Sequence, residues 1–157
     1  MLDRRTLVPA VALPLALALA LTGCGASRME RMTMAAGALH SVASGAGKLI
    51  DRTAEVRARA AFDRCEGERP QCEAEALAAV ESLRAAEAAQ HLFAAAVSAY
   101  ISAVITAAQS RDPDWSDALR HLGDAFGVYH AMREVLAEAG IEAPGIPAIV
   151  HNVMGDL

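Results

Sequence analysis

The sequence predicts an all-α protein, a bundle of three long antiparallel helices followed by a short C-terminal helix. Two observations predict this class. Apolar residues recur at spacings of three and four along three segments, and no segment shows the period-two alternation of a half-buried strand. Hydrophobic residues make up 54 % of the chain and aromatic residues only 4 %. Alanine supplies the difference. Because alanine favours helix but buries little area, the helices should be long and close together.

The first helix is expected at residues 29–64. Gly37 and Gly45 lie inside it, where a glycine costs about 0.5 to 1 kcal/mol relative to alanine. Either the helix bends or frays there, or the stripe of Gly37, Ser41 and Gly45 allows another helix to approach closely. The shared stripe favours close contact. The seam that predicts this helix consists of Met32, Ala35, Leu39, Val42, Ala46, Leu49, Thr53, Val56 and Ala60.

A second helix is expected at residues 73–110. Its second half is apolar around more than half of its circumference, which is typical of a helix covered by several neighbours. The apolar residues of this half are Leu92, Phe93, Val97, Tyr100, Ile101, Val104 and Ile105.

The third helix has the clearest boundary signals. Asp112 is expected as its N-cap, Pro113 as its first helical residue and Gly140 as its C-terminal stop. The seam between them consists of Trp115, Ala118, Leu122, Ala125, Tyr129, Met132, Leu136 and Ala139.

A short C-terminal helix is expected to start near Pro147. Its apolar stripe consists of Ile146, Ile149, Val150, Val153 and Leu157. We expect this stripe to close one end of the bundle. The alternative is an apolar segment that binds a partner protein.

The first 23 residues are expected to be an export signal and not part of the fold. Arg4 and Arg5 precede an apolar stretch at residues 7–21, which ends in small residues. The segment Leu21-Thr22-Gly23-Cys24 resembles the lipobox of bacterial lipoproteins. The resemblance implies removal of residues 1–23, a diacylglyceryl group on the Cys24 sulfur and an acyl chain on its new amine. The mature chain, residues 24–157, suits a single helical-bundle domain.

Acylation at Cys24 would anchor the protein to a membrane. Each buried methylene contributes about 0.8 kcal/mol, and two or more chains hold stably. The residue after the cysteine is Gly25 and not Asp. In lipoproteins of two-membrane bacteria, a residue other than Asp at this position is usually associated with the outer membrane. We therefore expect the periplasmic side of the outer membrane, or the outer leaflet of the membrane in a one-membrane bacterium.

Two other interpretations of the N-terminus remain. Residues 6–23 approach the length of a transmembrane anchor, but Pro9 and Pro14 disfavour a regular spanning helix. Residues 3–8 also resemble a twin-arginine export signal, although Asp3 stands where Ser or Thr is usual. That route would carry a folded protein.

Cys65 and Cys72 are expected to form a disulfide. They bracket a turn between the first two helices, and export places them in a compartment that permits disulfides. Once Cys24 is acylated, the remaining cysteine count is even. A redox or metal role is disfavoured, because the spacing is not Cys-x-x-Cys and no histidine lies nearby.

Charge and motifs exclude several classes of function. The net charge is -5, and loss of Asp3, Arg4 and Arg5 removes +1 and leaves -6, which argues against nucleic acid. Lys48 ends a glycine-rich sequence, but Leu49 stands where a phosphate loop needs Ser or Thr. The motifs of serine hydrolases, zinc proteases and attached haem are missing. We expect no enzyme and no cofactor.

A metal- or ligand-binding bundle is the alternative function. Glu87 and His91 stand four residues apart, as do His130 and Glu134. The Glu-x-x-His spacing of ferritin-like sites does not occur, and His130 points outward from its seam, where it should pair with Glu134 in solvent. We expect no metal site. The residues to test otherwise are Glu87, His91, His121 and His130.

The expected function is that of a non-enzymatic accessory or interaction protein of the cell envelope. About four residues separate Cys24 from the first helix, a reach of about 15 Å, so the partner should come to the membrane. The partner should be another envelope protein, as for a secretion pilotin, an exclusion factor or an immunity protein. Contact would use a helix face or residues 146–157.

Overall fold

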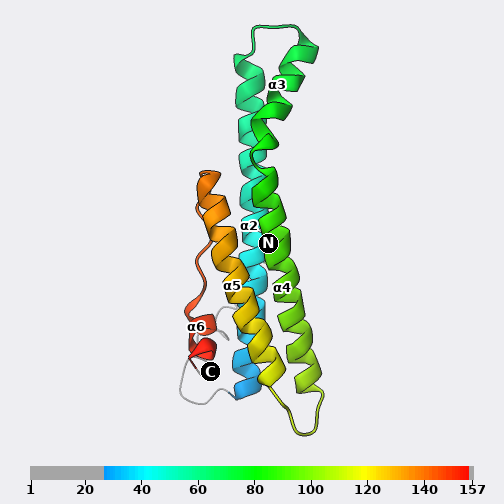
Figure 1. Cartoon of the computed structure of the whole chain (residues 1–157), viewed down its shortest axis with the longest axis vertical. Helices are drawn as coiled ribbons and strands as arrows, with labels where there is room; N and C mark the ends of the chain where they lie inside the picture. Colours follow the sequence, from blue (N-terminus) through cyan, green and yellow to red (C-terminus); the bar gives the residue numbers. More distant parts are fainter. Residues whose placement is uncertain (1–26, 156–157) are drawn as a thin grey trace, which may run out of the picture.

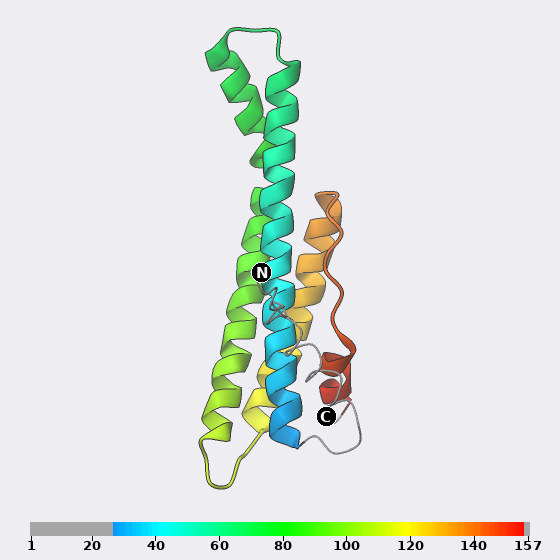
Figure 2. The same ribbon diagram turned by 180° about the vertical axis from the view of Figure 1, so that it is seen from behind.

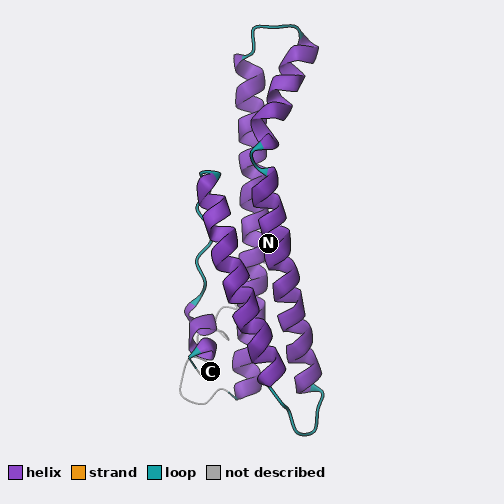
Figure 3. Ribbon diagram, viewed as in Figure 1, coloured by secondary structure: helices purple, strands orange, loops and turns teal. Residues whose placement is uncertain are grey.

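A computed structural model describes residues 27–155. Every regular element in this range is an α-helix, which confirms the all-α class (Figure 3). The helices are α2 (Arg28–Arg64), α3 (Arg69–Glu81), α4 (Arg84–Ala108), α5 (Ser116–Glu138) and α6 (Ala148–Met154).

The helices do not share one length. α2 runs along the whole molecule, and α3 and α4 return beside it in the opposite direction (Figures 1 and 2). α5 packs against α4, and α6 packs against α2. At 1.5 Å per residue, the 37 residues of α2 span about 55 Å and the 23 residues of α5 about 35 Å. Beyond α5, residues 51–81 continue as a two-helix projection, which we call the arm.

The hydrophobic core lies where α2, α4, α5 and α6 meet. The seam expected on α2 is buried from Met32 to Ala46, and burial ends at Ile50. Further along, Val56 is 61 % exposed, so the seam prediction is wrong for the arm. The reason is that α5 ends at Glu138 and leaves this part of α2 with α3 as its neighbour. The largest fully buried side chains are Tyr100, Phe93, Met32, Leu39, Leu122, Met132, Leu136, Val97, Val150 and Val153.

The helix expected at residues 73–110 is divided into α3 and α4. Ser82 and Leu83 form a turn between them, in which the Leu83 N–H donates to the Val80 carbonyl at 2.9 Å. The turn buries the Leu83 side chain in the core. α3 also begins earlier than expected, at Arg69, because a proline in the first helical turn needs no N–H partner there.

Arg57 ties this turn to the end of α5. Its guanidinium donates to the Ser82 hydroxyl at 3.1 Å and also to the Ala139 carbonyl. A cation at the C-terminal end of a helix is also favoured by the helix dipole. Arg57 thereby holds α2, the base of the arm and α5 in one arrangement.

We expect Arg57→Ala to lower the free energy of unfolding by about 1 to 3 kcal/mol, because hydrogen bonds from a charged donor are lost. Amide hydrogen exchange in α3 should speed up, since the base of the arm is released. Urea unfolding and hydrogen exchange measure the two effects. Arg59→Ala, at an exposed position of the same helix, is the control, and equal results for both variants would contradict the role of Arg57.

α5 begins later than the sequence signals indicate. Asp112 and Pro113 lie in the loop after α4, and the first helical residue is Ser116. The carboxylate of Asp114 accepts a hydrogen bond from the Ser116 N–H at 2.9 Å. The hydrogen bonds from Ser116 hold the pKa of Asp114 below its usual value. The helix therefore starts after a local turn, and the expected N-cap at Asp112 is wrong.

The C-terminal end of α5 follows the prediction. Gly140 has a φ of 69°, in the left-handed region that favours glycine. The Ile141 N–H reaches back to the Leu136 carbonyl at 2.8 Å, which closes the last turn of the helix. The chain then crosses to α6.

α6 closes one end of the helix bundle. Val150 is fully buried, and Val153 nearly so, in a helix that packs against α2. This confirms the expected start near Pro147 and the closing role of residues 146–155, and makes the partner-binding alternative wrong for them. Leu157, like residues 1–26, lies outside the described residues.

The close helix contact expected along the glycine stripe of α2 is not found in the described chain. A Cβ built on Gly45 would lie 3.5 Å from the Pro144 side chain, in the segment that leads to α6. A Cβ on Gly37 would meet open space, and Ser41 is exposed. Close approach at Gly45 is therefore to a loop, and no helix lies over the stripe in the described chain.

Tyr100 links α4 to the start of α2. Its hydroxyl is buried and donates to the Met32 carbonyl at 3.0 Å. Burial disfavours the phenolate and raises the pKa of Tyr100 to about 12, from 10.0. The folded state therefore keeps the proton to higher pH than the unfolded state does.

This difference predicts a loss of stability in alkali. The contribution of Tyr100 is fully present below pH 10 and is lost as the pH rises from 10 to 12, up to about 2 to 3 kcal/mol. Tyr100→Phe should cost about 1 kcal/mol at pH 8 and remove most of the alkaline decline. Urea unfolding at pH 8 and 11.5 tests this. An unchanged alkaline decline in Tyr100→Phe would show that other groups cause it.

Candidate interaction surfaces

The metal candidates from the sequence do not converge. Glu87 and His91 lie on the exposed side of α4, with carboxylate oxygen and imidazole nitrogen 3.7 Å apart. His121 lies 3.7 Å from Asp117 within α5. Among the described residues, no group of three or more His, Cys, Asp and Glu side chains is arranged to hold a metal ion. The structure thus leaves Glu87 and His91 as one pair on α4 and brings neither His121 nor His130 of α5 into a metal-binding group with them.

His130 makes an aromatic contact instead of the expected ion pair with Glu134. Its ring lies edge-on to Phe126, with ring centroids 4.8 Å apart. His151 of α6 meets the same Phe126 ring at 5.5 Å. Sequence reasoning missed this cluster because its members come from two helices. Since His130 and His151 are exposed, the cluster is open to water and is no desolvated binding site.

Two surface hollows lie along α5. One, of about 520 Å³, is lined by the aromatic cluster with Arg133, Glu142 and Ile146. The other, of about 480 Å³, lies between α4 and α5 beside Asp114 and Asp117. The Asp114 carboxylate accepts a hydrogen bond from the Ser116 N–H, and the Asp117 carboxylate forms an ion pair with the Arg120 guanidinium at an N–O distance of 2.7 Å. These carboxylates are therefore already engaged.

The arm exposes large apolar side chains. Leu77 on α3 is 70 % exposed, and Val56 and Phe62 on α2 are also exposed. Within residues 51–81 only Cys72 is buried. Among the described residues, the arm thus consists of two helices, and no third helix packs on them as α5 packs on α4.

A hollow of about 320 Å³ lies at the base of the arm, between α2 and the α3–α4 turn. We call it the arm groove. Its charged lining residues are Asp51, Glu81, Glu87 and Arg84, with acidic groups in excess. Its apolar lining residues are Ile50, Ala54, Leu77, Val80 and Leu83.

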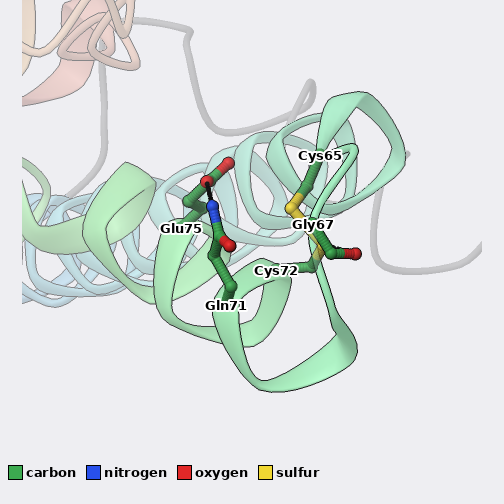
Figure 4. The surroundings of a disulfide bond; sticks show 5 residues. All are labelled: Cys65, Gly67, Gln71, Cys72 and Glu75. Carbon is green, nitrogen blue, oxygen red and sulfur yellow. Dashed lines mark hydrogen bonds between the residues drawn. A yellow bond between two sulfur atoms is a disulfide. The ribbon is translucent and has the colours of Figure 1, made fainter.

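A disulfide closes the tip of the arm (Figure 4). The sulfur atoms of Cys65 and Cys72 lie at bonding distance, with Cα atoms 5.4 Å apart, as the sequence predicts. The Gln71 side chain beside them donates to Glu75 at 3.2 Å (Figure 4). A disulfide across so short a loop contributes about 2 to 3 kcal/mol. It stabilises a segment that has almost no core of its own.

α4 also exposes large apolar side chains, separate from those of the arm. By length and composition alone, α4 is apolar enough to cross a membrane, a test that the core helix of a soluble protein also passes. It contacts both α2 and α5, but Leu92 is 66 % exposed and Ile105 is 52 % exposed. The expectation that several neighbours cover this helix therefore holds for one side, and the other side is open.

Comparison with known proteins identifies no relative. No protein-family model matches the chain, and neither the curated proteins nor the solved structures searched contain a match. The arguments that follow therefore rest on the residues and their geometry.

Proposed function

We propose that this protein is a lipid-anchored protein of the cell envelope that acts without catalysis by binding another envelope protein. The observation that carries the proposal is the arm, whose apolar side chains are exposed and on which no third helix packs within residues 27–155. A surface of this kind is the usual form of a helix-binding site.

The start of α2 fits an anchor close to the fold. Ser27 caps the helix through its hydroxyl, which accepts from the Glu30 N–H, while Glu30 accepts from the Ser27 N–H at 2.6 Å. The helix therefore begins sharply at Arg28. Cys24, outside the described residues, precedes this cap by three positions in the sequence. Acylation there would place one end of α2 at the membrane, on the periplasmic side of the outer membrane if the source has two membranes.

The length of α2 then sets where the partner binds. The arm tip lies about 55 Å from the start of α2, at the opposite end (Figure 1). With the linker's reach of about 15 Å added, the partner therefore binds within about 70 Å of the membrane and need not touch the lipid surface.

The charge of the arm favours one kind of partner. Residues 51–81 contain eight acidic and five basic residues, and the arm groove has the same excess. The fitting partner is an amphipathic helix of an envelope protein, with apolar side chains for the groove and basic side chains for its rim. Such charges steer encounter and select the partner.

Cross-linking in intact cells followed by affinity isolation tests this function. We expect Leu77→Ser with Val56→Ser to reduce the captured partner at least tenfold, because the apolar contact is removed. Both side chains are exposed, so folding should change by at most about 0.5 kcal/mol. Leu92→Ser, a leucine equally exposed on α4, is the matched control.

Two results would contradict the proposal. One is a partner captured equally by native protein and the arm variant. The other is purified protein that carries a stoichiometric metal ion, lost in His91→Ala, or that turns over a substrate. That second result would support the metal- or ligand-binding alternative.

A further inference from the structure

The Cys65–Cys72 disulfide is a covalent link across the far end of the arm (Figures 1 and 4). Cys65 is the C-cap of α2, and Cys72 lies near the start of α3. The opposite end of the arm is fixed separately, because Arg57 binds Ser82 there and Leu83 is buried in the core. The dependence of the arm on its disulfide is therefore set by the α2–α3 contacts between these two ends.

The α2–α3 interface consists mostly of small side chains. Within residues 51–81 only Cys72 is buried, and most of the half-buried residues of the two helices are alanines. Because an alanine buries little apolar area, this interface stabilises α3 only weakly. A free helix of 13 residues is itself marginal in water. The half-buried residues are Thr53, Ala54, Arg57, Ala58 and Ala61 of α2, and Ala76, Ala79 and Val80 of α3.

Polar contacts do not replace the missing packing. Among the described residues, the charged and amide side chains of α3 find their partners within the helix or on α4. The disulfide is therefore the main contact that keeps the far half of α3 on α2. The pairs are Arg69 with Glu73, Gln71 with Glu75, and Glu81 with Arg84.

The two sulfur atoms of the disulfide differ in access. Cys72 is only 5 % exposed, and its sulfur lies 3.5 Å from the Gly67 carbonyl oxygen, in the turn that covers it (Figure 4). Cys65 is more accessible, since it is only half-buried. A disulfide is opened by a thiolate that reaches one of its sulfur atoms. In the folded protein, Cys65 Sγ is the atom that such a thiolate reaches first.

We propose that this disulfide is a site of thiol–disulfide exchange that controls the arm, reduced by a dithiol that attacks Cys65. The thiolate of the dithiol bonds to Cys65 Sγ as the S–S bond breaks, and Cys72 leaves as a thiolate and takes up a proton. The second thiol of the dithiol loses its proton and attacks its own sulfur in the mixed disulfide. Cys65 then leaves as a thiolate and is protonated, and the dithiol has become a disulfide.

The spacing of Cys65 and Cys72 is no obstacle to this role. It disfavours a redox catalyst, which needs Cys-x-x-Cys, whereas here the disulfide is the substrate of the exchange. The step transfers two electrons from the dithiol to the protein and needs no further reactant.

Reduction is expected to unfold α3 while the bundle stays folded. The core lies where α2, α4, α5 and α6 meet and contains no residue of α3. Loss of α3 would separate Leu77 from Val56, which lie on the two helices of the arm. If the arm is the binding surface, as the proposed function holds, the reduced protein loses its partner. The opening of the arm does not depend on that function.

Hydrogen exchange of the full-length protein, with and without dithiothreitol, tests the opening. Amides of α3 should exchange at least about tenfold faster after reduction, because the loop constraint is lost. The near-ultraviolet circular dichroism of the core aromatic residues, Tyr100 and Trp115 among them, should not change. The double variant Cys65→Ser with Cys72→Ser is the matched control: its α3 should exchange rapidly both with and without the reagent.

Trapping of the mixed disulfide tests the site of attack. The two probes are glutathione, a small monothiol, and a Cys-x-x-Cys protein whose second cysteine is replaced by serine, since neither can complete the reduction. After rapid alkylation, peptide mapping should find the probe on Cys65 and the alkyl group on Cys72. Reaction with both probes indicates a protein dithiol as the reductant, and reaction with glutathione alone indicates a small one.

Three results would overturn the proposal. Equal protection of α3 in oxidised and reduced protein would show that packing alone holds the arm. Loss of the near-ultraviolet signal on reduction would show that the disulfide supports the whole fold. A probe found on Cys72 would refute the assigned site. Failure of the oxidised protein to capture any partner in cells would contradict the proposed function instead, and would leave the exchange and mapping results to decide the role of the disulfide.

Discussion

A chain that ends at Gly145 is expected to lose about 3 to 6 kcal/mol of folding stability. The truncation removes Val150 and Val153, and burial of each valine stabilises the fold by about 1.5 to 3 kcal/mol. It also uncovers the side of α2 on which α6 packs. Since the free energy of unfolding of a native protein is about 5 to 15 kcal/mol in total, the truncated protein should be partly or wholly unfolded at 37 °C.

Thermal unfolding followed by circular dichroism measures this loss. Asn152→Ala changes an exposed residue of α6 and should leave the melting temperature within a few degrees of native. If the truncated protein melts like the native protein but no longer captures a partner, α6 is a contact surface, and its assignment as core is wrong.

Replacing Cys24 by serine is expected to abolish acylation completely. The lipobox resemblance assigns the diacylglyceryl group to this sulfur, and serine cannot form the thioether. Mass spectrometry of the N-terminal peptide should find an acylated Cys24 in native protein, and neither acylation nor cleavage before position 24 in the variant. In the native protein, each acyl methylene buried in the membrane would contribute about 0.8 kcal/mol to membrane binding, and the variant loses this contribution.

The double variant Cys65→Ser with Cys72→Ser is the control for cysteine removal. It should keep the acylated N-terminus and the membrane attachment while losing the disulfide at the arm tip. A native chain that starts elsewhere, or Cys24→Ser protein that is still processed at the same position, would contradict the lipoprotein assignment.

Local patterns in the sequence predicted much of the fold. The expected bounds of α2, residues 29–64, differ from the observed ones by one residue, because the apolar seam marks the helix and the turn between Cys65 and Cys72 marks its end. Gly140 marked the end of α5, since a left-handed residue there requires glycine or pays a steric cost. The disulfide followed from two cysteines placed across a turn.

The division between α3 and α4 could not be read from the sequence. No proline or glycine lies near it, and alanine-rich flanks favour helix on both sides. The turn at Ser82 is stabilised by Arg57, 25 residues earlier in the chain, and by burial of Leu83. Both are tertiary contacts, which override local propensity.

The candidate surfaces could not be predicted from the sequence, because they too depend on tertiary contacts. The seam of α2 continues without change through Thr53 and Val56, so its pattern indicates a core along the whole helix. Only the end of α5 at Glu138 determines that these positions are exposed. An apolar stripe shows that a helix face is suited to packing, but it does not show whether the packing partner belongs to the same chain or to another.

Site-specific photo-cross-linking in living cells tests the proposed function most directly. A photoreactive amino acid at Leu77, which projects from the arm, reports what lies within a few ångströms of that position. We predict a covalent adduct of one defined partner from position 77 and none from position 131 on α5. The adduct should decrease strongly when Cys24 is replaced by serine. Absence of any adduct from positions 77 and 56, or an adduct from position 131 alone, would contradict the assignment of the arm as the binding surface.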